Sequence, residues 1–305
     1  MYGLILTARS QRFLVGRDHA DDNRRLMRGI ITILLAGVGS TWAETPTDHL
    51  RSMVESERNF YLEAQRKGTR PAFLDFFADD AIIFRPGPVN GKEVWRNRKT
   101  DLELIWEPTL AVISRNADLG YDTGPSKWRV DKSKEEWTYA SYISIWKKRP
   151  DGSWKVAVDC ATENPPPTTG PEPLQLKIPN EANDARSDSF AELQTEFFTA
   201  ARADFITAVD KFGSDDIRVY RDGAFPAAGK KMAIQALTAQ SGSLNMEVMH
   251  TDISSSGDLA YHYGKYSKAG STPVSQGYFL QIWRTNSSGH WTLVLDWQQA
   301  LPPEK

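Results

Sequence analysis

The chain has 305 residues, of which 40% are apolar and 11% aromatic, enough to build two ordinary domains with hydrophobic cores. This composition argues against a chain that is disordered throughout. The formal net charge of −2 provides no attraction to nucleic acid or to an anionic membrane surface, so we expect neither as a partner.

The first segment has the layout of an export signal. Residues 29–39, GIITILLAGVG, form an apolar run that follows several arginines and precedes small residues ending at Ala43. Such a run is too short to span a bilayer, which takes about 20 residues, but it suits a secretory signal peptide better than a buried helix. We expect residues 1–43 to be a signal peptide with an upstream extension (Met27 is an alternative start) and the protein to be periplasmic or secreted, by an unspecified route.

After this segment the sequence predicts the same series of elements twice. An amphipathic helix over 50–68 is followed by a short helix over 70–80 that ends in paired aspartates, a strand over 81–87 and a third helix over 91–105. The second copy of these elements runs through 189–203, 204–216, 217–223 and 229–241.

The remainder of each copy is rich in strands. RNADLGYDTGPSKW at 115–128 reappears as SSGDLAYHYGKYSK at 255–268, so that Asp118 and Asp258 correspond at an offset of 140 residues. Further on, YASYISIWKKRPDGSWKVAVD matches SQGYFLQIWRTNSSGHWTLVLD, and each segment alternates apolar and polar residues around a glycine-containing turn. An offset this long indicates a duplicated domain.

A proline-rich stretch lies between the two copies. Proline stiffens extended chain and disfavours helices and central strands, so this stretch has the composition of a linker. The sequence therefore predicts a first domain over 44–165, a linker over 166–186 and a second domain over 187–305.

Several short motifs carry a resemblance to a known family. They come in pairs, one member in each half: ADDA at 78–81 and SDDI at 214–217, NGK and AGK before the third helix, and DLGY and DLAY. With these motifs each half resembles the SnoaL-like and ketosteroid-isomerase-like branch of the nuclear transport factor 2-like superfamily. The resemblance implies an α+β fold class with two cone-shaped domains. Each would be a curved antiparallel sheet wrapped on about three N-terminal helices, with a pocket at its open end, and the two would pack through their sheets as an internal pseudo-dimer.

One face of the penultimate strand in each half has the composition of a ligand wall. Tyr142, Ser144 and Trp146 share a face opposite Ile143 and Ile145. A sheet-to-sheet interface is also rich in tyrosine and tryptophan, and this interpretation is the favoured one. The candidate ligand-binding residues are Tyr121, Tyr142, Trp146, Tyr261, Gln281 and Trp283.

Three titratable residues are candidates for catalysis: Asp159, Asp296 and His262. The aspartates end the last strand of each half, on the face opposite Trp154, Val156 and Val158 in the first half, and an apolar surrounding would suit a general base. The favoured alternative is a carboxylate that pairs with backbone or with a strand arginine, Arg85 or Arg221 in the respective half. His262 is a natural acid–base residue, although a partly exposed histidine without a function is more common.

The sequence gives no reason to expect a metal or a cofactor, because its histidines show no ligand spacing. The single cysteine, Cys160, lies in an alternating strand and is predicted to be a buried, inert thiol.

These features lead to two hypotheses of different class, and a small-molecule ligand is the expected partner in both. The first is an exported protein that binds a small apolar or aromatic molecule in a cone-shaped pocket. The alternative is a cofactor-free isomerase, cyclase or dehydratase of a cyclic substrate, with an aspartate base and a tyrosine donor. A third possibility is that one half has lost its pocket and supports the other.

Overall fold

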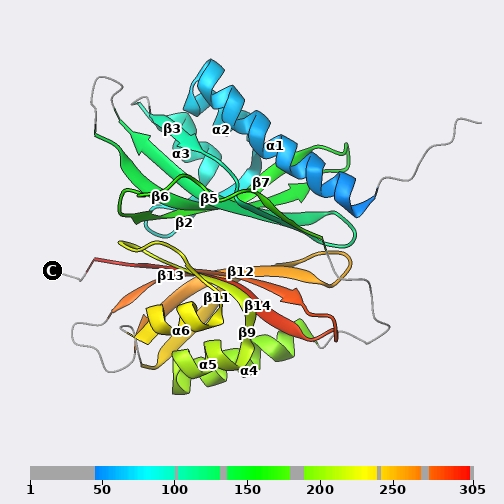
Figure 1. Cartoon of the computed structure of the whole chain (residues 1–305), viewed down its shortest axis with the longest axis vertical. Helices are drawn as coiled ribbons and strands as arrows, with labels where there is room; N and C mark the ends of the chain where they lie inside the picture. Colours follow the sequence, from blue (N-terminus) through cyan, green and yellow to red (C-terminus); the bar gives the residue numbers. More distant parts are fainter. Residues whose placement is uncertain are drawn as a thin grey trace, which may run out of the picture. The chain divides into compact units, whose positions relative to one another are not determined.

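The structure is a computed structural model of the whole chain. It describes residues 45–99, 102–130, 136–178, 189–238, 242–268 and 275–302. The expected signal peptide over 1–43 lies outside the described residues. Within the described ranges the chain forms two sheets, each with helices on one face (Figure 1).

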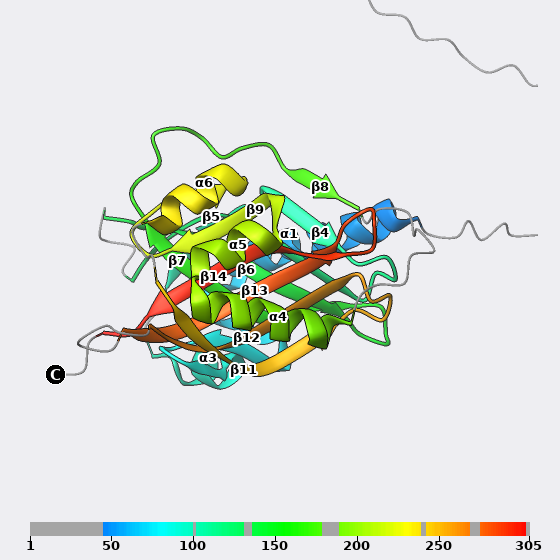
Figure 2. The ribbon, with the colours of Figure 1, turned by 90° about the horizontal axis from the view of Figure 1, so that it is seen from below.

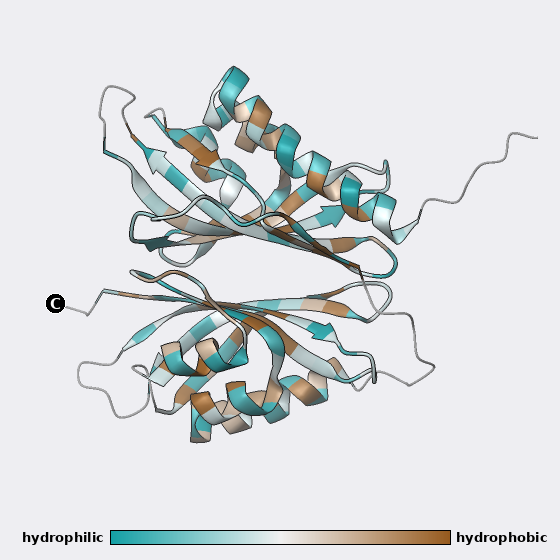
Figure 3. Cartoon of the chain, in the orientation of Figure 1, coloured by the Kyte–Doolittle hydropathy of each residue, from teal (hydrophilic) through white to brown (hydrophobic). Residues whose placement is uncertain are grey.

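The first helix of each half begins where its sequence supplies a cap. In α1 (Pro46–Lys67), Thr45 accepts a hydrogen bond from the backbone N–H of Asp48, whose carboxylate accepts from the N–H of Thr45 in return. In α4 (Phe190–Ala203), the Ser189 hydroxyl accepts from a backbone N–H in the first turn. Figure 3 shows hydrophilic and hydrophobic bands alternating along α1. The predicted helices over 50–68 and 189–203 are confirmed.

The second helices end earlier than predicted. α2 (Thr69–Phe76) passes directly into strand β1 (Phe77–Phe84), and α5 (Phe205–Phe212) into β9 (Gly213–Arg221). The paired aspartates therefore belong to strands, and Asp79 and Asp80 are exposed. They lie where the register between β1 and the last strand of this half shifts, a site that tolerates polar side chains.

The third helices are also shorter than predicted. α3 (Gly91–Asn97) is followed by strand β3 (Glu103–Trp106), and α6 is limited to Lys230–Leu237. The residues of β3 pair with the long strand β5 (Leu119–Arg129), and this pairing brings Trp106 into the core. Backbone pairing and burial of a tryptophan thus override a sequence pattern compatible with helix.

The two sheets share one strand plan. The first has the order β2-β1-β7-β6-β5-β4-β8, with β3 also paired to β5, and the second has the order β10-β9-β14-β13-β12-β11. Most pairs are antiparallel, as predicted, but β1–β7, β4–β8 and β9–β14 are parallel. The remaining strands of the first sheet are β2 (Pro88–Asn90), β4 (Leu110–Ile113), β6 (Thr138–Lys148), β7 (Trp154–Asn164) and β8 (Gln175–Lys177). Those of the second are β10 (Ala227–Ala228), β11 (Leu244–Ile253), β12 (Leu259–Lys268), β13 (Gln276–Thr285) and β14 (Trp291–Ala300).

The proline-rich stretch contains one short strand. β8 pairs in parallel with β4 at the edge of the first sheet, inside the predicted linker over 166–186. An edge position is where a strand next to prolines is tolerated, because only one side of it needs hydrogen bonds.

Each sheet has a helix-covered face and a second face that is also buried. Figure 2 shows α4 and α5 over the strands of the second sheet. On the other faces, Ile143 and Ile145 of β6 join Leu280 and Ile282 of β13 in one hydrophobic cluster that takes residues from both sheets. The favoured interpretation of the aromatic face of β6 was therefore wrong, since Tyr142 and Trp146 face the helices. The aliphatic face of each sheet packs against the other sheet, where β-branched side chains such as isoleucine fit well.

A bulge in the last strand of each half changes which side chains face the helices. Across β6 and β7, Ile145 pairs with Val158 but Trp146 pairs with Val156, which leaves Ala157 as an extra residue. β13 and β14 show the same shift between Ile282 and Trp283. The simple alternation expected for this strand was wrong beyond the bulge. Val158 lies between the sheets, and Asp159 lies on the helix side.

The repeated phrase is explained by a reciprocal contact between the halves. The Asp118 carboxylate accepts a hydrogen bond from the backbone N–H of Ser255 at 2.8 Å, and the Asp258 carboxylate accepts from the backbone N–H of Arg115 at 3.0 Å. Each copy of the turn therefore caps the other, as in the self-complementary interface of a two-fold dimer.

The cluster between the sheets should contribute to stability like a domain core. Leu280 is fully buried there, and replacing it in Leu280→Ala should lower the free energy of unfolding by about 2–4 kcal/mol, measured by urea unfolding with tryptophan fluorescence. Leu62→Ala, at a side chain that is 59% exposed, is the control and should cost less than about 0.5 kcal/mol. Equal costs for the two variants would contradict this account of the cluster.

Candidate functional site

A cavity of ≈ 920 Å³ lies in the first half and reaches residues of the second. This volume is ample for a small organic ligand. Its aromatic lining comes from helices and sheets and comprises Phe60, Phe73, Phe84, Trp95, Trp106, Trp128, Tyr142 and Trp297. Its polar lining includes Arg85, Arg98, Asp159 and Glu163 and, from the second half, Asp222 and Gln299.

A buried glutamate of α1 lies beneath this aromatic lining. The carboxylate of Glu57 accepts a hydrogen bond from the indole N–H of Trp106 and another from that of Trp146 at 3.0 Å. Burial raises the pKa of Glu57 to about 7, although the hydrogen bond from Trp106 opposes the shift. The carboxyl group is therefore positioned by two rigid donors and exchanges a proton near neutral pH.

Two aspartates of the sheet lie close to Glu57. Asp122 on β5 is fully buried, and neither of its carboxyl oxygens makes a well-formed hydrogen bond with a described residue. Burial, followed by the neighbouring Glu57 carboxyl, raises the pKa of Asp122 well above its usual range. A raised pKa favours the protonated form of Asp122, and protonation lessens the repulsion between the two neighbouring carboxyl groups.

Of the three neighbouring carboxyl groups, those of Glu57, Asp122 and Asp159, the one that lines the cavity is that of Asp159. The Ser144 hydroxyl donates a hydrogen bond to it at 3.1 Å across the β6–β7 pair. Burial raises the pKa of Asp159 to about 7, and the hydrogen bond from Ser144 and the charge of Arg85 oppose the shift. A carboxyl group with this pKa can both accept and release a proton near neutrality.

Tyr142 supplies the second polar atom of the aromatic wall. Its hydroxyl oxygen is buried and makes no well-formed hydrogen bond with a described residue. Burial, reinforced by the charge of Asp122, raises the pKa of Tyr142 well above its usual range. The hydroxyl remains protonated and is a buried donor in the cavity wall, with Asp122 as a neighbouring carboxyl group.

The second half carries a different polar set at the equivalent positions. Gln194, His262, Gln281 and Asp296 stand where the first half has Glu57, Asp122, Ser144 and Asp159. Their hydrogen bonds form a closed chain, in which the amide of Gln281 donates to Asp296 at 2.7 Å and Arg221 pairs with Asp296 at 2.6 Å. The predicted pairing with Arg221 is confirmed for this half, but the predicted strand-end position was wrong, because Asp296 lies within β14 and Asp159 lies within β7.

His262 is fully buried, so the expectation of a partly exposed histidine was wrong. Its Nδ1 lies 2.5 Å from the amide nitrogen of Gln194, and its Nε2 lies 2.7 Å from the amide oxygen of Gln281. Burial lowers the pKa of His262 to about 4, so the imidazole is neutral. This histidine acts as a satisfied core residue.

The remaining sequence candidates are divided between two environments. Tyr121 and Tyr261 lie in the cluster between the sheets, because each pairs across its strand with an isoleucine of that face, Ile145 or Ile282. They belong to that cluster rather than to the cavity lining, contrary to what a ligand-binding role would require. Trp146, Trp283 and Gln281 are fully buried beneath the helices. Cys160 is buried as predicted, and burial raises the pKa of its thiol.

Sequence reasoning missed Glu57, Asp122 and Arg98. A signal for Glu57 was present, since Met53, Glu57 and Phe60 recur at helical spacing on the buried face of α1. A carboxyl group within such an apolar stripe is costly to bury and points to a function or to a polar partner. Asp122 gave no comparable signal, because its neighbours Glu57 and Ser144 come from distant segments.

Among the residues that the structure describes, no three or more His, Cys, Asp or Glu side chains are grouped to hold a metal ion. In the same part of the chain no helix is both long and apolar enough to cross a membrane.

The chain is similar to solved structures that each match a little over a third of it. A ketosteroid isomerase-like protein from Erwinia carotovora atroseptica is 19% identical, with 38% of this chain and 96% of that chain covered and a TM-score of 0.32. A protein from Shewanella oneidensis described as NTF-2 like and of unknown function is 13% identical, with 35% and 91% covered and a TM-score of 0.29. An NTF2-like protein of unknown function from Pseudomonas putida is 13% identical, with 39% and 88% covered and a TM-score of 0.31. No family model and no curated protein matches the chain. The case for a function rests on the side chains of the cavity.

The buried carboxyl groups predict an unusual dependence of stability on pH. Glu57 and Asp159 have pKa values raised to about 7, against about 4 in an unfolded chain. Between these values the folded state binds more protons at each of the two carboxyl groups, which lowers the free energy of unfolding by up to about 1.4 kcal/mol per pH unit and group as pH rises. Buried His262, with a pKa lowered to about 4, has the opposite slope and offsets about one of these groups, so the net free energy of unfolding should still fall from pH 4 to pH 7. Urea unfolding across this range measures the slope.

Asp159→Asn removes one of the two titrations and should make the slope shallower. Glu55→Gln changes an exposed carboxyl on the same helix as Glu57 and serves as the control, with the slope of the unmodified protein. A wild-type free energy of unfolding that rises steadily from pH 4 to pH 7 would contradict the protonated state assigned to the buried carboxyls.

Proposed function

We propose that the first half binds a small organic molecule with an apolar ring system in its cavity. The observation that carries this proposal is the cavity of ≈ 920 Å³, which combines an aromatic wall with two polar groups, Asp159 and the unpaired hydroxyl of Tyr142. Aromatic walls hold a ring by apolar contact, and a few placed polar groups set its orientation. A ligand oxygen that accepts from Tyr142 would satisfy the buried donor.

The second half, in this proposal, supports the first and has no ligand of its own. Its polar set is satisfied internally through Gln281, Asp296 and Arg221. Its Trp297 and Gln299 line the cavity of the first half, and Trp297 also packs on Phe84. The two halves would then act as one intramolecular pseudo-dimer with a single working pocket. We also propose that the protein works after export, on the strength of its N-terminal sequence alone.

Native mass spectrometry of protein purified from the exported fraction tests both parts of this proposal. We expect a chain that lacks residues 1–43 and carries the additional mass of a retained small molecule. Ala161→Trp should lose this additional mass, because Ala161 is exposed and lines the cavity, so an indole there occupies its space. Ala191→Trp, exposed on α4, is the matched control and should retain it.

A retained N-terminus would contradict export. A wild-type chain without additional mass, also after incubation with small aromatic compounds, would contradict ligand binding.

A second candidate function is cofactor-free proton transfer on a cyclic ketone. One observation favours it. Asp159, whose pKa is raised to about 7, lines the same cavity as Tyr142, whose buried hydroxyl is a hydrogen-bond donor. Asp159 would remove a proton next to the carbonyl, and Tyr142 would donate a hydrogen bond to the oxygen on which negative charge develops.

Deuterium exchange at the α-carbon of a bicyclic ketone in D2O, followed by NMR, tests this second function. Asp159→Asn should slow the protein-catalysed exchange at least about 100-fold, and Tyr142→Phe about 100- to 1,000-fold. Asp296→Asn changes the equivalent aspartate of the second half and should retain the wild-type rate. Exchange that persists in Asp159→Asn would rule out Asp159 as the base.

A further inference from the structure

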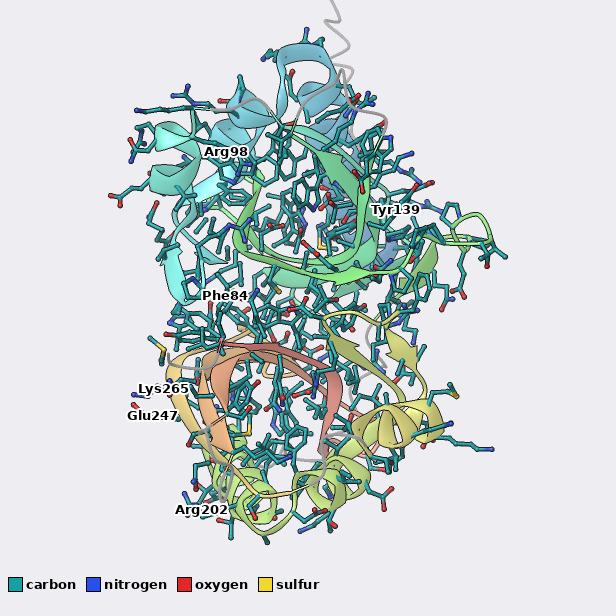
Figure 4. All side chains as sticks on the ribbon, turned by 90° about the vertical axis from the view of Figure 1, so that its left-hand side faces the viewer. Phe84, Arg98, Tyr139, Arg202, Glu247 and Lys265 are labelled. Carbon is teal, nitrogen blue, oxygen red and sulfur yellow. The ribbon has the colours of Figure 1, made fainter. Side chains whose placement is uncertain are left out.

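Two arginines line the cavity in addition to Asp159 and Tyr142. Arg85 follows β1 and Arg98 follows α3, and both contribute to the lining of the cavity. Figure 4 labels Arg98 beside the curved first sheet. Arg85 is exposed and Arg98 is half-buried, so the two arginines place positive charge at a pocket whose walls are largely aromatic.

The guanidinium of Arg98 packs on an aromatic ring, and its Nε lacks a hydrogen-bond acceptor among the described residues. Its guanidinium carbon lies 5.2 Å from the ring centroid of Trp95, which fixes one face of the group. Its Nε is buried and has no hydrogen-bond partner among the described residues. Burial, followed by the charge of Arg85, lowers the pKa of Arg98.

The second half shows how such a charge is neutralised when no ligand is required. There Arg221, the equivalent of Arg85, forms a buried ion pair with Asp296 at 2.6 Å. In the first half no ion pair within the described residues involves Arg85 or Arg98. The side chain of Arg85 donates a hydrogen bond to the carbonyl oxygen of its neighbour Phe84, and its backbone N–H donates to that of Gly87. The acidic residues Glu163 and Asp222 also line the cavity, and Asp222 accepts a hydrogen bond from the N–H of Glu163.

We propose that the ligand of this cavity is an organic carboxylate, whose anionic group pairs with Arg98 and Arg85 while its ring lies against the aromatic wall. The proposal rests on the proposed binding function and specifies its ligand class. A guanidinium with a free Nε presents two parallel N–H groups, Nε and one Nη, which match the two oxygens of a carboxylate. The ring would then extend past Trp106 and Phe73 towards Tyr142, whose hydroxyl makes no well-formed hydrogen bond with a described residue and could donate to an oxygen at the far end.

Isothermal titration calorimetry of the full chain with two matched probes tests this inference. Naphthalene-2-carboxylate and naphthalene-2-carboxamide share a ring body and differ in charge at about pH 6. We expect the carboxylate to bind at least about tenfold more tightly, since hydrogen bonds to charged groups are the stronger ones. Arg98→Met keeps the length of the side chain and should remove this preference while leaving the affinity for the carboxamide unchanged.

Arg96→Met is the matched control, because Arg96 is exposed on α3 and does not line the cavity, and it should behave as the wild type. Equal affinity of the wild type for both probes, or an equal loss for both in Arg98→Met, would overturn the carboxylate proposal and leave ligand binding in place. Binding of neither probe would also overturn it, and ligand binding as such is then judged by the mass of a retained molecule in native mass spectrometry.

Discussion

A single extra residue in the last strand of each half determines what both faces of the sheet can do. The bulge at Ala157 turns Val158 toward the other sheet and Asp159 toward the helices. In an unbroken strand the aspartate would lie in the inter-sheet cluster, where no donor could satisfy it, and the valine would leave that cluster incomplete. The same shift beside Trp283 shows that the bulge belongs to the duplicated plan, and that the site and the interface depend on it together.

The two halves differ in the side chains that surround the aspartate turned toward the helices by this bulge, Asp159 in the first half and Asp296 in the second. In the second half Arg221 and Gln281 satisfy Asp296, which yields a closed network. In the first half Glu57 and Asp122 place acid beside acid, and the cost is met by protonation rather than by a cation. This difference shows how one fold can hold a satisfied polar network in one copy and a cavity lined by acidic and aromatic side chains in the other.

The sequence predicted features that depend on local pattern and on repetition. The first helices, the hairpin around Gly152 and the correspondence of Asp159 with Asp296 needed only periodicity and alignment. The faces of the strands were not predictable in the same way, because a bulge is invisible to a simple alternation. The pairing that converts residues 103–106 from helix to strand is a tertiary effect, and so is the meeting of Glu57 with Asp122.

Duplication provides the stability that such a pocket needs. Raised carboxyl pKa values mean that the folded state of the first half is penalised near neutral pH, and a single small domain has little stability to spare. The second half adds a shared hydrophobic cluster and the reciprocal contacts of Asp118 and Asp258. Most of these contacts lie on the face opposite Glu57 and Asp122, and the cluster meets the cavity at Phe84, Cys160 and Trp297. The polar set of the first half can therefore differ from that of the second while the interface stays symmetric, and the second half contributes to the stability of the first through these shared contacts.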